Sequence, residues 1–174
     1  MPVNLPAITF AETGHLCLCT LHANNANQAL DRIIHFFPPE RHTQLWMDLS
    51  LNMRGMIAQQ LVPTPDGSGR RAVVEVLLNT PLASDLIRKG EVQKLKELMK
   101  RSNEQGMQTF DQALHTLYGR GEITYEDAIA HADSSNDLRL MIKLDKNEGR
   151  APNAEPATGL QMESDAVEQS KIFR

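Results

Sequence analysis

The feature that most constrains the fold is a short apolar run joined directly to an amphipathic helical pattern. Residues 16–21 read Leu-Cys-Leu-Cys-Thr-Leu and lie between two histidines, His15 and His22. An apolar run this short, bounded by turn-forming residues, is typical of a buried strand. Asn24 or Asn25 can then cap the helix that follows by accepting its free N–H groups. This pattern places His22 where a strand ends and a helix begins, which is where ligands bind in α/β sheets.

The rest of the sequence predicts one pair of strands among several helices. Asp66-Gly67, between the two strand patterns, is a strong hairpin signal. Thr80 is expected to cap a helix that starts at Pro81, and Thr109 with Gln112 forms a predicted capping box. The further strands are expected at 56–62 and 71–78, and the helices at 26–37, from Pro39 to about Arg54 (ended by Gly55), 82–89, 91–103, 109–118 and 124–132. Residues 138–144 alternate as in a strand, but the turn and cap residues before them favour a terminal helix.

Composition excludes several classes of protein. The 174 residues are 41% hydrophobic and 23% charged, which fits one globular domain with at most a small appendage. The net charge of -4 argues against a nucleic-acid-binding protein, which would present a basic face. No apolar run approaches the roughly 18 residues of a membrane helix, and the first residues lack the pattern of a signal peptide. A cytoplasmic location without a membrane span is therefore predicted.

His15 and His22 are the candidates for acid–base chemistry or phosphate sensing. They are seven residues apart, so on one strand they would face opposite sides and lie roughly 23 Å apart. One metal ion bound by both is therefore not expected, and no metal site is predicted. Cys17 and Cys19 share a strand face and read as small, reduced core residues.

Motifs that hold a nucleotide triphosphate are absent from the sequence. There is no G-x-x-x-x-G-K-[ST] loop and no apolar strand ending in Asp-Glu to hold Mg²⁺. Residues 67–70, Gly-Ser-Gly-Arg, share only the composition of a phosphate loop, because they join two strands and lead into no helix. The chain alone is therefore expected not to hydrolyse ATP.

Several segments, in order and spacing, resemble the type IV pilus retraction (twitching motility) ATPases, the PilT/PilU family of hexameric motors in the secretion ATPase superfamily. Residues 7–26 closely resemble the His box of that family, and the similarity extends to about residue 144. The other matching segments are 31–33, 59–63, 74–81, 85–90, 106–114 and 136–140. Residues 16–19 and 79–87 are more similar to the PilU members than to the PilT members.

The resemblance implies an α/β fold, an incomplete RecA-like P-loop NTPase core (its C-terminal half) followed by a helical C-terminal subdomain. Residues 1–80 would form the core part with the His box and the β-hairpin, and residues 81–146 the helical subdomain. Residues 147–174 are predicted to be a disordered tail, because they have little apolar periodicity. The PAS-like domain, Walker A loop, Asp box and Walker B strand of the family have no counterpart here. We therefore expect a C-terminal fragment or the product of a truncated gene.

The family couples ATP hydrolysis to pilus retraction and twitching motility. The resemblance implies ATP and Mg²⁺ as cofactors, and a homo-hexamer or a mixed assembly with other pilus motor ATPases. It also implies the pilus platform protein of the inner membrane as a partner, with the chain peripheral at the pilus base. The residues it assigns are His15 and His22 (catalytic, His box), Thr20 and His22 (nucleotide contacts) and Leu86, Ile87 and Arg88 (retraction motif).

Two alternatives stay open at this stage. The chain could be a non-enzymatic module that docks through its helices onto a motor subunit or the platform protein. It could also be the product of a truncated gene with no independent role.

Overall fold

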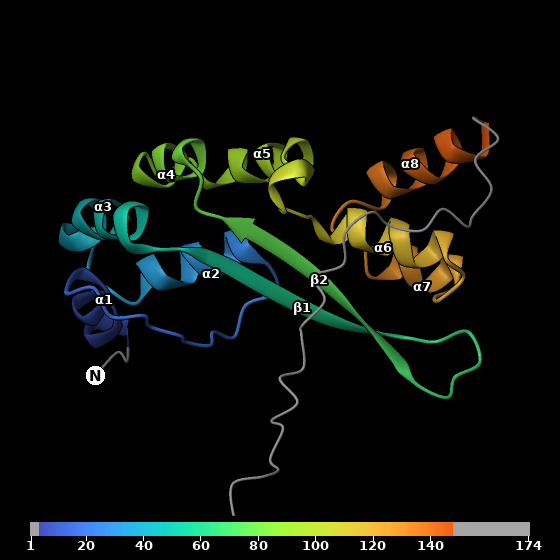
Figure 1. The fold of residues 1–174 in the computed structure, drawn as a ribbon, viewed down its shortest axis with the longest axis horizontal. Helices are drawn as coiled ribbons and strands as arrows, with labels where there is room; N and C mark the ends of the chain where they lie inside the picture. The colour runs from blue at the N-terminus through green and yellow to red at the C-terminus, as the bar shows by residue number, and fades with distance from the viewer. Residues whose placement is uncertain (1–3, 148–174) are drawn as a thin grey trace, which may run out of the picture.

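The computed structural model describes residues 4–147, which form eight α-helices, three short 3₁₀ helices and two strands. A long β-hairpin runs through the molecule, with one group of helices at each end (Figure 1). In chain order the elements are α1 Asn4–Glu12, α2 Ala26–His35, η1 Pro39–Arg41, α3 His42–Asn52, β1 Gly55–Pro63, β2 Arg70–Leu78, α4 Pro81–Arg88, η2 Val92–Lys94, α5 Leu95–Arg101, η3 Asn103–Gln105, α6 Phe110–Gly119, α7 Tyr125–Ala130 and α8 Ser135–Asn147.

The predicted hairpin is confirmed. β1 and β2 pair antiparallel from Gly55 opposite Leu78 to Pro63 opposite Arg70. The helix that was predicted to reach about Arg54 is shorter: α3 ends at Asn52, and Gly55 is the first residue of β1. A Cβ atom on Gly55 would lie 2.9 Å from the carbonyl oxygen of Leu77, so the close approach of the two strands requires glycine there.

Helix starts follow local capping chemistry as predicted. The Asn25 side chain accepts from the N–H of Gln28 at the start of α2, and Thr80 does the same for α4, with Pro81 in the first turn. Both halves of the capping box at Thr109 and Gln112 are present at the start of α6. These caps satisfy N–H groups that have no partner within their helices. Residues 138–144 lie within helix α8, as expected.

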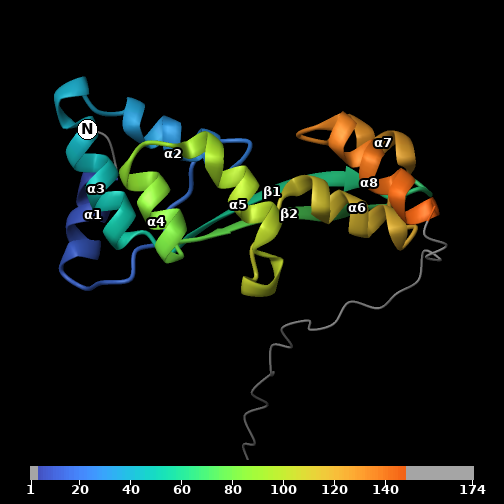
Figure 2. The same ribbon diagram turned by 90° about the horizontal axis from the view of Figure 1, so that it is seen from above.

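Two hydrophobic clusters form the core. The first contains residues of the helices α2, α3, α4 and α5 together with Leu77 of β2. Its most buried members include Leu30, Ile87, Leu95 and Met99. The second joins the far part of the hairpin to α6, α7 and α8, around Val62, Val73, Phe110, Leu114 and Leu138. Seen from above, the two groups of helices lie at opposite ends of the hairpin (Figure 2).

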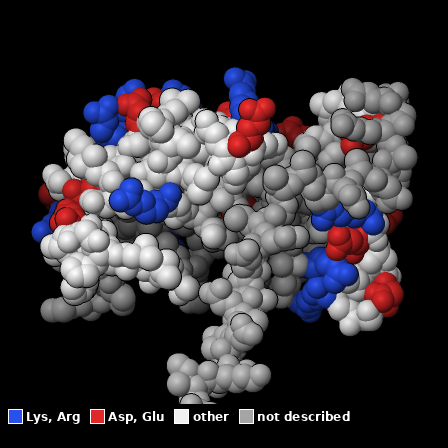
Figure 3. Space-filling view, viewed as in Figure 1, with Lys and Arg blue, Asp and Glu red and all other residues white. Residues whose placement is uncertain are grey.

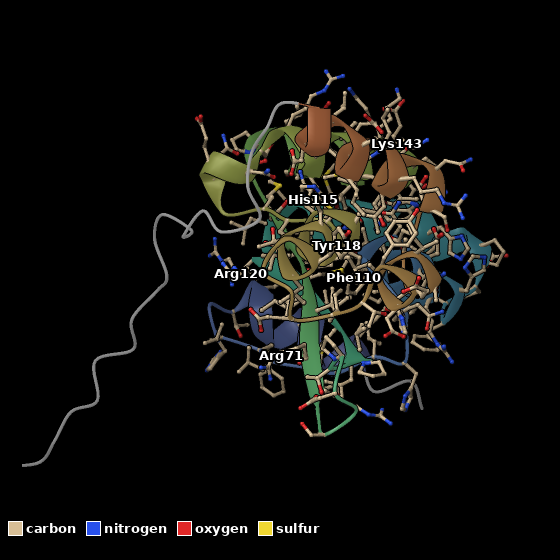
Figure 4. All side chains as sticks on the ribbon, turned by 90° about the vertical axis from the view of Figure 1, so that its right-hand side faces the viewer. Arg71, Phe110, His115, Tyr118, Arg120 and Lys143 are labelled. Carbon is tan, nitrogen blue, oxygen red and sulfur yellow. The ribbon has the colours of Figure 1, made fainter. Side chains whose placement is uncertain are left out.

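A surface ion pair connects the hairpin to the turn after α6. Arg71 of β2 lies 2.6 Å from the carboxylate of Glu122, and Arg120 lies 3.8 Å from the same carboxylate. Tyr118 and Tyr125 pack edge to face nearby, with ring centroids 5.9 Å apart. Figure 4 looks onto this end of the molecule and shows Arg71, Tyr118 and Arg120 around α6.

The prediction of a buried strand at residues 16–21 is wrong. The segment has no regular secondary structure, and Leu16 and Leu18 are 80% and 90% exposed. A strand needs a neighbour to take up its N–H and C=O groups, and the described residues place none beside this segment. The apolar side chains therefore stay in solvent.

The division into two domains at residue 80 stays a prediction. The first hydrophobic cluster combines residues from both sides of that boundary, namely α2, α3 and Leu77 with α4 and α5. The predicted tail lies outside the described residues except for Asn147, which ends α8. Within the described range 4–147, no helix is both long enough and apolar enough to cross a bilayer.

Candidate functional site

The segment from His15 to His22 runs in the open between α1 and α2. Gly14 has a φ of 87°, a left-handed conformation that suits glycine, and it ends α1. His15 is exposed, its Nδ1 lies 3.0 Å from the Thr13 hydroxyl, and its ring meets Phe10 edge to face. Thr20 is exposed as well. The part of the surface over α1 and the following segment carries few charged side chains (Figure 3).

The backbone of His22 is fixed by a hydrogen bond, and its side chain is accessible to a ligand. The guanidinium of Arg32 on α2 donates a hydrogen bond to the His22 carbonyl oxygen. The imidazole itself is exposed, and no side-chain partner for it occurs within residues 4–147. An exposed imidazole with a fixed backbone can donate to or accept from an oxygen brought to it.

The N-terminus of α2 is already occupied by a carboxylate of this chain. The N–H of Ala26 donates to Oε1 of Glu75 at 2.8 Å, across 49 residues of sequence. The N–H of Gln28 donates to the Asn25 side chain at 2.9 Å. A helix start of this kind attracts anions, and here Glu75 supplies the negative charge.

Glu75 belongs to a charged network that reaches α5 and the segment after α7. Its side chain is fully buried, and its Oε2 pairs with the ammonium of Lys96 on α5. Lys96 also pairs with Asp133, which follows α7, and lies over the ring of Phe110, 5.9 Å from its centroid. Burial opposes the charge on Lys96, but the hydrogen bonds to Asp133 and Glu75 outweigh it and raise the pKa of the ammonium.

Asp111 holds the other end of this network. It is 4% exposed and accepts hydrogen bonds from the backbone N–H groups of Asp133 at 2.9 Å and Ser134 at 3.2 Å. Burial raises the pKa of this carboxyl, and the two backbone hydrogen bonds only partly oppose the rise. The network borders a polar cleft of about 510 Å³, lined by Asn25, Asn27, Gln28, Asp31, Gln93, Lys96, Lys100, Thr109, Asp111, Asp133 and Ser134.

Sequence reasoning missed Glu75, Lys96, Asp111 and Asp133. One signal was available: Val73, Glu75 and Leu77 share a strand face, and the carboxylate interrupts an otherwise apolar run. A charge at such a position requires a buried partner. The partner could not be named, because Lys96 is one of several lysines in a segment that reads as an ordinary amphipathic helix.

The three residues assigned to the retraction motif divide into two kinds. Leu86 is 8% exposed and Ile87 is fully buried in the first hydrophobic cluster, so both hold α4 in place. Arg88 is exposed and lies 2.6 Å from Asp85 of the same helix, which also pairs with Lys89. Of the three side chains, Arg88 alone is accessible to another molecule, and His15 and His22 lie on a different segment.

The described residues do not form a complete nucleotide or metal site. No group of three potential metal-ligating side chains occurs among residues 4–147. The N–H groups of Ala26 and Gln28 at the start of α2 are taken by Glu75 and Asn25, and Arg32 is committed to the His22 carbonyl. The residues present therefore do not fit ATP with Mg²⁺ by themselves.

The histidine segment, the capped helix α2 after it and the hairpin with helices at both ends form one arrangement. Two solved structures share this arrangement. The crystal structure of the pilus retraction motor PilT with bound ADP matches with a TM-score of 0.70 and 35% identity, over 78% of this chain and 38% of PilT. The ATPase DotB of Legionella pneumophila matches with a TM-score of 0.60 and 25% identity, over 72% of this chain and 34% of DotB.

Residues 4–131 match the family described as type II/IV secretion system protein, and the chain belongs to this family. It is 81% identical to the type IV pilus ATPase PilU of Pseudomonas aeruginosa over 138 residues, which are 79% of this chain and 36% of that relative. It is 36% identical to PilT of the same organism over 70% of this chain. The chain spans about a third of the length of these relatives, and the predicted family and fold class are confirmed.

Proposed function

We propose that this chain is the C-terminal part of a PilU-type pilus retraction ATPase, a cytoplasmic motor at the pilus base that couples ATP hydrolysis to twitching motility. The observation that carries the proposal is the 81% identity to PilU over 138 residues. In this proposal the motor is a hexamer, alone or mixed with other pilus ATPases, and it acts on the platform protein of the inner membrane.

In this role His22 reports the state of the nucleotide. Its imidazole is exposed and its backbone is fixed by Arg32, so one hydrogen bond to a terminal phosphate can form or break without rearranging α2. His15 and Thr20 lie on the same open segment and are the other proposed contacts. The phosphates and Mg²⁺ would be held by a phosphate loop outside this sequence.

A chimeric motor tests the proposal directly. Residues 7–144 would replace the matching part of Pseudomonas PilU, and ATP hydrolysis would be measured on the purified chimera. We expect turnover comparable to PilU, and a drop of about tenfold or more in His22→Ala, because a lost contact to a charged group costs about 1.5–3 kcal/mol. Cys19→Ser, an exposed change on the same segment, is the matched control and should leave turnover unchanged. An inactive chimera that folds and forms the hexamer would refute the proposal.

The 174-residue chain alone should not turn over ATP, because its sequence contains no G-x-x-x-x-G-K-[ST] loop to hold the β- and γ-phosphates. Purified chain would be assayed for phosphate release with Mg²⁺ and ATP. Release above that of a heat-denatured sample would contradict this part of the proposal.

A second function, docking onto a motor subunit without catalysis, is favoured by exposed apolar side chains. Leu16, Leu18 and Ile57 are 77–90% exposed, and unpaired apolar surface of this kind marks interaction sites. Immobilised chain should retain full-length motor subunits at micromolar concentration, and Leu18→Asp should weaken retention. No retention by the wild-type chain would exclude docking of this kind.

A further inference from the structure

Glu75 lies on β2 between the two hydrophobic clusters. Two other buried residues share its strand face: Leu77 belongs to the first cluster and Val73 to the second, with the carboxylate between them. A buried carboxylate costs free energy unless it is paired, so the position of Glu75 depends on the partners of its two oxygens.

The two oxygens of Glu75 bind different elements. Oε1 accepts from the N–H of Ala26, the first residue of α2 and only four residues after His22. Oε2 pairs with Lys96 on α5, and Lys96 pairs in turn with Asp133 after α7. Asp133 is fixed by its own N–H, which donates to Asp111 on α6. One continuous set of polar contacts therefore runs from the His22 segment to the helices of the second cluster.

We infer that Glu75 is a positioning residue, which holds the start of α2 and the adjoining His22 segment in a fixed place relative to α5 and to the helices of the second cluster. Glu75 acts through the α2 backbone, because it contacts Ala26 and does not contact His22. The ion pair with Lys96 holds the carboxylate in place, with its other oxygen aimed at the Ala26 N–H. The importance of this placement for nucleotide sensing rests on the proposed function, whereas the placement itself does not.

The test uses the nucleotide-free 174-residue chain and two NMR readouts, hydrogen exchange of the Ala26 amide and the imidazole resonances of His22. Lys96→Met leaves the buried carboxylate without its cation, and we expect Ala26 exchange to rise by about tenfold with a shift of the His22 signals. Exchange at the core amides of Leu30 and Leu114 should change less than about twofold. That contrast separates a local effect from general loss of stability.

Two further variants keep the test decisive. Glu75→Gln retains an oxygen for the Ala26 N–H but not the charge, so in the double variant with Lys96→Met it should bring Ala26 exchange back to within about threefold of wild type. This recovery also covers the case in which Lys96→Met alone does not fold. Lys96→Arg should keep both readouts close to wild type.

Lys100→Met is the matched control. Lys100 lies one turn along on the same helix and pairs with Asp137 at 2.9 Å, without contact to Glu75. It should leave Ala26 exchange and the His22 signals unchanged. Equal effects of the two lysine variants, no effect of Lys96→Met, or an effect at Ala26 without one at His22 would each overturn the assignment. An inactive chimeric motor with the expected exchange pattern would count against the proposed function and not against this assignment.

Discussion

The carboxylate of Asp111 on α6 accepts a hydrogen bond of 2.9 Å from the backbone N–H of Asp133, 22 residues further along the chain. This contact closes the turn between α7 and α8 onto α6. Asp111→Ala removes the acceptor of two hydrogen bonds, and the backbone N–H groups of Asp133 and Ser134 lose their partner. We therefore expect a loss of about 1–3 kcal/mol in the free energy of unfolding. Asp111→Asn keeps one acceptor and should lose less. Urea unfolding measures both, and equal losses would contradict the role of the hydrogen bond.

The charge on Asp111 should make the stability of the folded protein depend on pH. Burial raises the pKa of this carboxyl in the folded protein above the 3.8 of the free side chain. The charged form is therefore disfavoured by folding at neutral pH, and protonation removes that cost. Stability of the wild type relative to Asp111→Asn should increase as the pH falls from 7 through the folded pKa towards 3.8. A difference that stays constant or moves the other way over this range would show that the charge is not disfavoured.

The part of α4 proposed as the retraction motif should show a sharp contrast between neighbouring residues. Ile87 is fully buried, so Ile87→Ala should cost about 2–5 kcal/mol through lost burial and the cavity left behind. Arg88 is exposed and its ion pair lies on the surface, so Arg88→Ala should change stability by less than about 0.5 kcal/mol. Thermal or urea unfolding checks both. Only Arg88→Ala can then be used to test the motif in a motor without confusing lost function with lost folding.

Leu82 supplies a control for the same helix. Its side chain is 56% exposed, and Leu82→Ala should leave the free energy of unfolding within about 0.5 kcal/mol of wild type. A large loss in Leu82→Ala together with none in Ile87→Ala would mean that α4 packs through its opposite face.

Local chemistry made much of this fold predictable from sequence. The caps at Asn25, Thr80 and Thr109 depend on residues within three positions of each other. The hairpin depends on a turn between two strand patterns that are neighbours in the sequence. Such signals act over a few residues and need no knowledge of the rest of the chain. The burial of the α2 stripe around Leu30 follows in the same way from its helical period.

What could not be predicted depends on contacts between distant residues. Residues 16–21 have the composition of a strand, but whether they form one depends on a neighbouring strand, and residues 4–147 place none beside them. The link between Glu75 and Lys96 spans 21 residues, and its extension to Asp133 spans 37 more. No periodicity in the sequence selects these partners from the other charged residues. The candidate site was therefore predicted at His22 and missed at Glu75.

Thr109, in the capping box of α6, should contribute more to the free energy of unfolding than an exposed threonine of the same helix. Thr109 is 2% exposed, and its hydroxyl and N–H both take part in the exchange of hydrogen bonds with Gln112. Thr109→Ala should cost about 1–2 kcal/mol. Thr116→Ala, on the exposed face of the same helix, should stay within about 0.5 kcal/mol of wild type. Equal effects of the two variants in urea unfolding would show that the cap adds nothing.

In the hairpin turn, hydrogen bonds act on an exposed carboxyl, that of Asp66. Hydrogen bonds from Ser68, and next from Thr64, lower the pKa of Asp66 from 3.8 to about 2. A carboxyl whose pKa is depressed by folding stabilises the turn above the unfolded value, and this contribution is lost as the pH falls from 3.8 through about 2. Ser68→Ala should therefore raise the pKa of Asp66 towards 3.8, and Thr64→Val should raise it by a smaller amount. An NMR titration of the Asp66 carboxyl carbon measures all three values. The critical result is which of the two variants raises the pKa of Asp66 more. A larger rise in Thr64→Val than in Ser68→Ala would mean that Thr64, and not Ser68, supplies the stronger hydrogen bond.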